Sequence, residues 1–89
     1  MEQEGVSMSD INDVRKQAIV MLCKGSRKAQ RLTLVAAGNR TNYHYTTLSK
    51  FERGYRFSWD MAEAYARNIL NPAERATYEK IKGDILNGR

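Results

Sequence analysis

The chain has 89 residues, a formal net charge of +5, one cysteine and one histidine, a composition that fits a single small domain. It contains no apolar run long enough to cross a membrane, and a lone Cys23 with a lone His44 excludes an internal disulfide and argues against a metal site. Because no familiar catalytic or nucleotide-binding motif occurs, we expect no enzyme, no cofactor and no small-molecule substrate.

The chain begins with MEQEGVSMSD, which is polar and acidic and lacks the basic start and apolar run of a secretory signal. We therefore expect a cytoplasmic protein in which residues 1–9 form a flexible tail. Residues 10–89 are then expected to form the single domain.

The first predicted helix begins near Asp10, a residue suited to capping a helix start. Apolar residues at spacings of three and four predict one buried face: Ile11, Val14, Ala18, Met21 and Leu22. Three further residues widen that face: Ile19, Val20 and Cys23. The helix is therefore either well buried or also meets a partner, and Cys23 is interpreted as a buried apolar residue rather than a reactive thiol. Gly25-Ser26 either ends the helix or lies within a longer one.

Two short helices with a tight turn between them are predicted next. Thr33 is a helix-capping residue ahead of LVAAGNRT, and Asn42 tolerates the left-handed backbone of a tight turn. A helix over residues 44–53 then carries Leu48 and Phe51 on its inner side, and a glycine follows its end.

Two longer helices complete the chain. Ser58 or Asp60 caps SWDMAEAYARNIL, and Asn71-Pro72 ends it because the residue before a proline disfavours helical backbone. Its apolar face is Ala62, Tyr65, Ala66 and Ile69. A last helix over residues 72–87 carries an apolar stripe of Tyr78, Ile81 and Ile85. No segment alternates as a strand would, so we predict an all-α fold, a compact bundle of about five helices.

The positive charge is confined to the middle third of the chain. Residues 24–56 contain eight basic residues and one acidic residue, Glu52, a net charge of +7. The remainder of the chain has seven basic and nine acidic residues, a net charge of −2. A polyanionic partner explains this concentration, because each neutralised phosphate releases condensed counterions. The alternative is a basic face that is only solvated.

Residues 34–51, LVAAGNRTNYHYTTLSKF, satisfy the steric requirements of a helix-turn-helix. Gly38 is the small residue at the helix crossing, and Asn42, four positions later, can take the left-handed conformation of the turn. Apolar residues face inward on both sides of the turn: Ala37, Tyr43, Leu48 and Phe51. Thr41 fits less well, since a larger apolar residue would pack better there. An ordinary helical hairpin is the alternative interpretation.

The stretch LTLVAAGNRTNYHYTTLSKFERG, residues 32–54, resembles without a gap the lambda-repressor-like helix-turn-helix family, the phage-repressor or xenobiotic-response-element type of regulator. The resemblance implies a structural ion pair between Arg27 of the first helix and Glu52 at the end of the recognition helix. The chain departs from the family at Leu34, where a glutamine commonly reaches a phosphate, and at Gly38, where alanine is usual. KGSRK and a YxxTTL-like segment give a weaker resemblance to fimbrial-operon regulators, which use another helix-turn-helix.

The resemblance implies that the recognition helix enters the major groove and presents the residues near its start to base edges. The expected base-reading residues are Tyr45, Thr46, Ser49 and Lys50. The expected phosphate-binding residues are Thr33, His44, Arg53, Tyr55 and Arg56. Lys50 could donate to guanine, and Thr46 could offer a methyl to thymine or a hydroxyl to either base type. The alternatives are that Tyr45 is a core aromatic or a phosphate contact, and that Lys50 is only solvated.

Together these observations predict a sequence-specific regulator of transcription that binds double-stranded DNA, a repressor of phage, plasmid or mobile-element type. We expect a homodimer through the C-terminal helix, whose stripe exceeds what the core clearly needs, and hence a palindromic operator with half-sites roughly 34 Å apart. The alternative is that this stripe closes the chain's own core. The alternative function is a protein-interaction module of the same fold that binds another regulator or RNA polymerase, and RNA binding through tyrosine stacking is a third.

Overall fold

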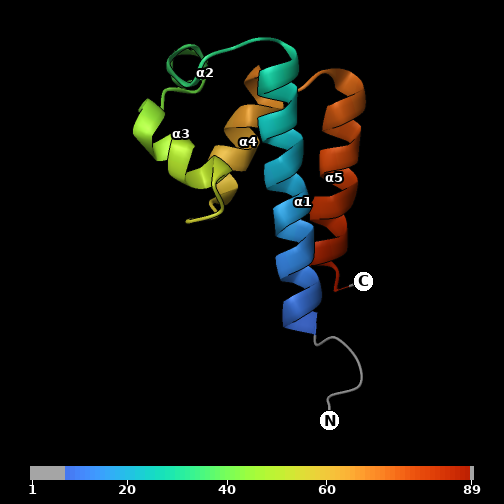
Figure 1. The fold of residues 1–89 in the computed structure, drawn as a ribbon. Helices are drawn as coiled ribbons and strands as arrows, with labels where there is room; N and C mark the ends of the chain where they lie inside the picture. The colour runs from blue at the N-terminus through green and yellow to red at the C-terminus, as the bar shows by residue number, and fades with distance from the viewer. Residues whose placement is uncertain (1–7, 89) are drawn as a thin grey trace.

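The computed structural model describes residues 8–88, which form five helices (Figure 1). They are α1 (Met8–Ala29), α2 (Leu34–Thr41), α3 (Tyr45–Glu52), α4 (Trp59–Asn68) and α5 (Pro72–Leu86). α1 and α5 lie side by side and run in opposite directions, while α2, α3 and α4 group around the C-terminal half of α1. No strand occurs within residues 8–88. The predicted all-α fold with about five helices is confirmed.

α1 starts earlier than predicted, and it does not end at Gly25-Ser26, where the sequence had left a break open. α1 begins at Met8, so the boundary near Asp10 was wrong by two residues, and Asp10 lies in the first turn, where a negative charge favours the helix dipole. Residues 1–7 of the predicted tail lie outside the described residues. α1 runs through Gly25-Ser26 without a break, and the buried Ser26 hydroxyl donates to Glu74 Oε1 of α5 at 2.7 Å.

Side chains beside each helix start explain the other boundaries. Thr33 caps α2 by accepting from a backbone N–H at 3.0 Å, as predicted. Ser58, rather than Asp60, caps α4 by accepting from a backbone N–H at 3.3 Å. Asn71 and Glu74 form a capping box at the start of α5, with a proline at its first position. Short-range chemistry therefore fixes where these helices begin.

Only part of the apolar face predicted for α1 enters the core. Its buried apolar residues are Ile19, Val20 and Cys23. Val14 and Met21 are instead 66% and 69% exposed, and Ala18 is also exposed, so the predicted face was wrong for these three residues. The apolar surface of α1 is wider than its neighbours cover, and packing selects the side that continues into the buried Ser26 and Arg27.

The apolar stripe of α5 closes the core of its own chain. Other helices contribute Ala37, Leu48, Phe51, Met61, Ala62, Tyr65 and Ala66 to that core. Tyr78 is fully buried in it, and Ile81 and Ile85 pack against it. Leu86, 64% exposed, is a large apolar side chain that α5 leaves in solvent. All three residues of the stripe therefore pack within their own chain, in agreement with the alternative that the stripe closes the chain's own core.

Cys23 is a fully buried member of the core. Burial raises the pKa of its thiol to about 12, and the negative charges of Glu52 and Glu74 act in the same direction. Because the thiolate is the reactive form, the side chain is unreactive at neutral pH. Its interpretation as a buried apolar residue agrees with this environment.

Glu63 links α4 to α5 through hydrogen bonds. Its carboxylate accepts from the Tyr78 hydroxyl and, at 2.5 Å, from Lys82 Nζ, and Arg67 of its own helix lies 3.9 Å away. The hydrogen bond from Lys82, followed by that from Tyr78, lowers the pKa of Glu63. The partly buried carboxylate is therefore held in its charged form.

We expect Glu63→Gln to lower the melting temperature at pH 7 and to have little effect in acid. A lowered folded-state pKa stabilises the fold above the ordinary value of 4.5, and that contribution is lost as the pH falls through the folded pKa. Melting curves followed by circular dichroism from pH 7 down to about pH 3 measure the difference. Glu79→Gln, an exposed change on α5, is the matched control. An equal drop in melting temperature at every pH would contradict a stabilising role for the charged form of Glu63.

Candidate nucleic-acid interface

The turn that joins α2 to α3 is fixed by two residues. Asn42 has φ 65° and ψ 25°, in the left-handed region, and its N–H donates to the Gly38 carbonyl at 2.8 Å. A Cβ added at the buried Gly38 would lie 2.5 Å from the carbonyl oxygen of Tyr43. Asn42 therefore turns the chain, and Gly38, which has no side chain, lets the turn approach α2 closely. Thr41 is also buried, but its hydroxyl is satisfied because it donates to the Ala37 carbonyl at 2.9 Å.

α3 has a buried side and an exposed side. Leu48 and Phe51 are fully buried, and the Phe51 ring centre lies 5.5 Å from that of Tyr65. The four predicted base-reading residues are not part of this buried side: Tyr45, Thr46 and Lys50 are exposed and Ser49 is partly exposed. Tyr45, at 46% exposure, is therefore not a core aromatic. The helix presents to solvent the residues that the sequence assigned to base edges.

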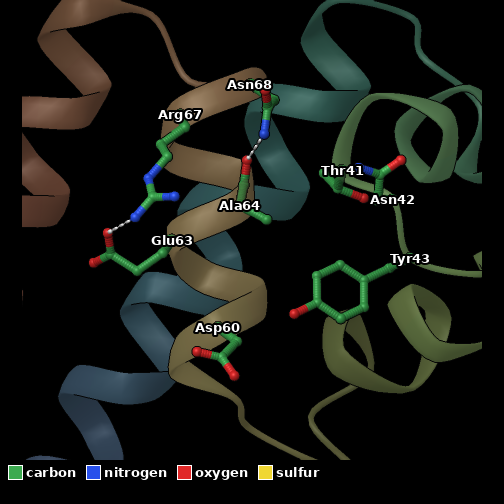
Figure 2. Close-up of a pocket in the computed structure, with 8 residues that line it drawn as sticks. All are labelled: Thr41, Asn42, Tyr43, Asp60, Glu63, Ala64, Arg67 and Asn68. Atoms are coloured by element: carbon green, nitrogen blue, oxygen red, sulfur yellow. Dashed lines mark hydrogen bonds and ion pairs between the residues drawn. The ribbon is translucent and has the colours of Figure 1, made fainter.

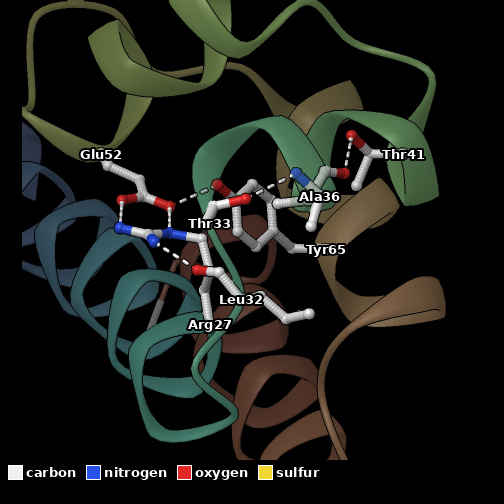
Figure 3. Close-up of polar contacts among 8 residues, drawn as sticks. Arg27, Leu32, Thr33, Ala36, Thr41, Glu52 and Tyr65 are labelled. Carbon is white, nitrogen blue, oxygen red and sulfur yellow. Dashed lines mark hydrogen bonds and ion pairs between the residues drawn. The ribbon is translucent and has the colours of Figure 1, made fainter.

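Glu52 is buried in an ion pair at the end of α3 (Figure 3). Nε and Nη2 of Arg27 donate to its two carboxylate oxygens at 2.7 and 2.8 Å, so the pair implied by the resemblance is present. The Tyr65 hydroxyl donates to the same carboxylate at 2.5 Å, and Arg27 Nη1 donates to the Leu32 carbonyl at 2.7 Å. The hydrogen bond to Glu52 raises the pKa of Arg27, while burial, followed by that carboxylate, raises the pKa of Tyr65.

This network ties α1, the segment that precedes α2, and α4 to the end of α3. The family resemblance implied Arg27 and Glu52 but not Tyr65, which the sequence pattern placed only on the apolar face of its helix. A tyrosine in a buried stripe was the available signal, since a buried hydroxyl needs a hydrogen-bond partner. The consequence is that the orientation of the exposed face of α3 depends on interior polar contacts.

His44 is the residue that caps α3. Its Nδ1 accepts from the Thr46 backbone N–H at 3.3 Å and lies 2.7 Å from the Thr46 hydroxyl. Its ring also lies against that of Tyr45, with the centres 4.7 Å apart. Nδ1 is therefore committed to the helix start, and Nε2 is the ring nitrogen that could donate to a phosphate.

The predicted phosphate-binding residues are exposed before α2, in the turn between α2 and α3, and after α3. All five are in solvent: Thr33, His44, Arg53, Tyr55 and Arg56. Arg53 Nη2 donates to the Tyr55 hydroxyl at 3.2 Å, and its guanidinium lies 4.8 Å from the centre of that ring. Gly54, with φ 79°, turns the chain between them. The contact holds a cation beside an aromatic ring just after α3.

The basic segment has an exposed set of cations that we name the basic surface. Its members are Lys28, Arg31, Arg40, Lys50, Arg53 and Arg56. The segment's single acid, Glu52, does not reduce this charge at the surface because it is buried against Arg27. Sequence reasoning did not assign Lys28, Arg31 and Arg40 individually, because spacing alone does not show which cations remain free of an acidic partner.

Two hollows flank Tyr45 on the surface formed by α2 and α3. The first, of about 290 Å³, is lined by Leu34, Tyr45, Thr46, Ser49, Lys50 and Arg53. The second, of about 260 Å³, is lined by Val35, Gly38, Asn39, Tyr43, His44 and Tyr45. All four predicted base-reading residues line the first hollow, together with Leu34, which the resemblance marked as a lost phosphate contact.

A third hollow lies between α4 and the turn after α2 (Figure 2). It measures about 380 Å³ and is lined mainly by polar side chains: Thr41, Asn42, Tyr43, Asp60, Glu63, Arg67 and Asn68, with Ala64. Asn68 donates to the backbone carbonyl of Ala64 at 2.9 Å, and Arg67 faces Glu63. None of the predicted base-reading residues lines this hollow.

Other kinds of site are not formed by the described residues. Within residues 8–88, no three His, Cys, Asp or Glu side chains gather where they could hold a metal ion. In the same part of the chain, no helix combines the length and the apolar character needed to cross a bilayer. Comparison of the chain with protein-family models, with curated proteins and with solved structures finds no match in any of the three.

Proposed function

We propose that this protein is a sequence-specific transcriptional regulator that binds double-stranded DNA through a lambda-repressor-like helix-turn-helix, a repressor of phage, plasmid or mobile-element type. One observation carries the proposal: residues 24–56 expose six cations while their one acid, Glu52, is buried in an ion pair. A surface of this charge attracts a polyanion and binds it in a salt-dependent way.

In the proposed complex α3 lies in the major groove. Tyr45, Thr46, Ser49 and Lys50 meet base edges. Thr33, His44, Arg53, Tyr55 and Arg56 meet phosphates and fix the register of the protein on the duplex. The close approach at Gly38 and the left-handed Asn42 support a helix-turn-helix, and the buried contacts of Glu52 hold α3 at a defined angle.

We expect the protein to bind a duplex selected from random sequences, with an affinity that falls steeply as salt rises. Arg56→Ala should weaken binding to every sequence alike, because it removes one phosphate contact. It should also reduce by about 1 the slope of log affinity against log salt concentration. Lys50→Ala should relax the preference at one base pair, worth about 1–3 kcal/mol. Fluorescence anisotropy of labelled duplexes at several salt concentrations measures both effects.

The matched control is Lys80→Ala, which removes an exposed cation of α5 that lies outside residues 24–56. It lowers the net charge by the same amount as Arg56→Ala and should leave the affinity nearly unchanged. A Lys80 variant as weak as the Arg56 variant would mean that only total charge matters. Binding that ignores salt would contradict the DNA-binding proposal.

The second candidate is a protein-interaction module of the same fold that binds another regulator or RNA polymerase. Val14 and Met21, large apolar side chains exposed on α1, favour it, because exposed apolar groups are what a protein partner covers. Such a contact should depend weakly on salt, unlike binding to phosphates. A complex with another protein that persists at high salt, without measurable duplex binding, would favour this candidate.

Pairing of two copies through α5 remains a prediction. Tyr78, Ile81 and Ile85 pack within the chain, so a pairing surface on α5 would depend on the exposed Leu86. Light scattering after size-exclusion chromatography should then give twice the 10.2 kDa of one chain, and Leu86→Glu should give the single-chain mass. A wild-type protein that is monomeric at tens of micromolar would contradict pairing.

A further inference from the structure

We infer that the hollow between α2 and α3 receives the C5-methyl group of a pyrimidine, so that the operator carries thymine or 5-methylcytosine opposite Leu34. This inference rests on the proposed DNA-binding function and specifies which base edge that surface reads. The hollow, of about 290 Å³, contains the outward residues of α3 together with the first residue of α2.

Leu34 gives the hollow an apolar wall. It is half-buried and packs against the core, so its side chain is held in place rather than free in solvent. It has no group that can donate to or accept from a base edge. The C5-methyl group is the apolar feature that a base pair presents in the major groove, and contact with it needs only a carbon surface of this kind.

Thr46 adds a second apolar contact. Its hydroxyl lies 2.7 Å from Nδ1 of His44 and is therefore already engaged at the start of α3. The hydroxyl that donates to Nδ1 has no second proton for a base, and the methyl group is the apolar contact that Thr46 can offer. The Tyr45 ring, 46% exposed, lines the same hollow and widens its carbon surface.

The charges in the lining fit the surroundings of such a base. Lys50 and Arg53 belong to the basic surface and line the hollow together with Leu34. They can meet a neighbouring guanine or the flanking phosphates while the methyl group contacts carbon. The Leu34 side chain offers a phosphate no donor, so the apolar wall of the hollow favours a methyl group over an anion.

The experiment uses the intact protein and a duplex selected from random sequences. Each thymine of the selected site is replaced singly by uracil, which removes the methyl group and keeps the base pairing. One such replacement should weaken binding about fourfold, the effect of one buried methyl group. Leu34→Ala should bind the thymine and uracil duplexes equally, and Thr46→Ser should reduce the difference between them.

Val35→Ala is the matched control, because Val35 follows Leu34 on α2, is 55% exposed and does not line this hollow. It should keep the full preference for thymine over uracil. A further pair of duplexes carries cytosine or 5-methylcytosine at the sensitive position. Tighter binding of the 5-methylcytosine duplex assigns the hollow to the methyl group of either pyrimidine, whereas equal binding restricts it to thymine.

Three results would overturn the inference. They are a selected site in which no thymine-to-uracil change matters, a preference that survives in Leu34→Ala, and a preference lost equally in Val35→Ala. In each of these the protein still binds DNA, so the proposed function stands. Absence of salt-dependent duplex binding would overturn the proposed function, and the inference with it.

Discussion

Replacing Glu52 with leucine should lower the free energy of unfolding by about 3–5 kcal/mol, because it leaves the Arg27 guanidinium buried without its counter-ion. The Arg27 side chain is 10% exposed and that of Glu52 is 4% exposed, so water can replace little of the lost contact. The Tyr65 hydroxyl loses its acceptor as well. Urea denaturation followed by circular dichroism measures the change.

The double variant Arg27→Met with Glu52→Leu is the informative comparison. It replaces both charges by apolar groups and should be far more stable than the sum of the two single losses predicts, because no unpaired charge remains. Tyr65→Phe should cost only about 1 kcal/mol, since it removes one hydrogen bond and leaves the ion pair. Strictly additive losses in the double variant would show that the pair is not coupled.

Gly38→Ala should lower the free energy of unfolding by about 1–2 kcal/mol although alanine is the better helix former. The added Cβ would lie 2.5 Å from the Tyr43 carbonyl oxygen, and a backbone atom cannot move aside as a flexible side chain can. The same substitution should weaken duplex binding, because the turn that positions α3 must shift. Chemical denaturation and anisotropy measure the two effects.

Gly25→Ala provides the control for this comparison. Gly25 is also helical, but an added Cβ there has no neighbour within 4 Å. The substitution should therefore stabilise the protein by about 0.5–1 kcal/mol through helix propensity alone. If Gly38→Ala stabilised the protein as much as Gly25→Ala, the close approach of the turn to α2 would be disproved.

Local chemistry allowed the starts of α2 and α5 and the turn after α2 to be predicted from the sequence. Thr33 and Asn71 act on backbone groups within a few residues, and Asn42 needs only its own tolerance of positive φ. The residues on the outward side of α3 were implied by the family resemblance, and the burial of Leu48 and Phe51 leaves them on the side that faces solvent. These features required no knowledge of distant neighbours.

Tertiary structure decided the features that depend on which surfaces meet. The side of α1 that enters the core could not be read from its wide apolar stripe, so Val14 and Met21 were misplaced. The third partner of the Arg27–Glu52 pair, the link from Glu63 to α5 and the hollow beside Leu34 also join residues far apart in the chain. Spacing along a helix gives the angle between side chains, but only packing determines which neighbour each side chain contacts.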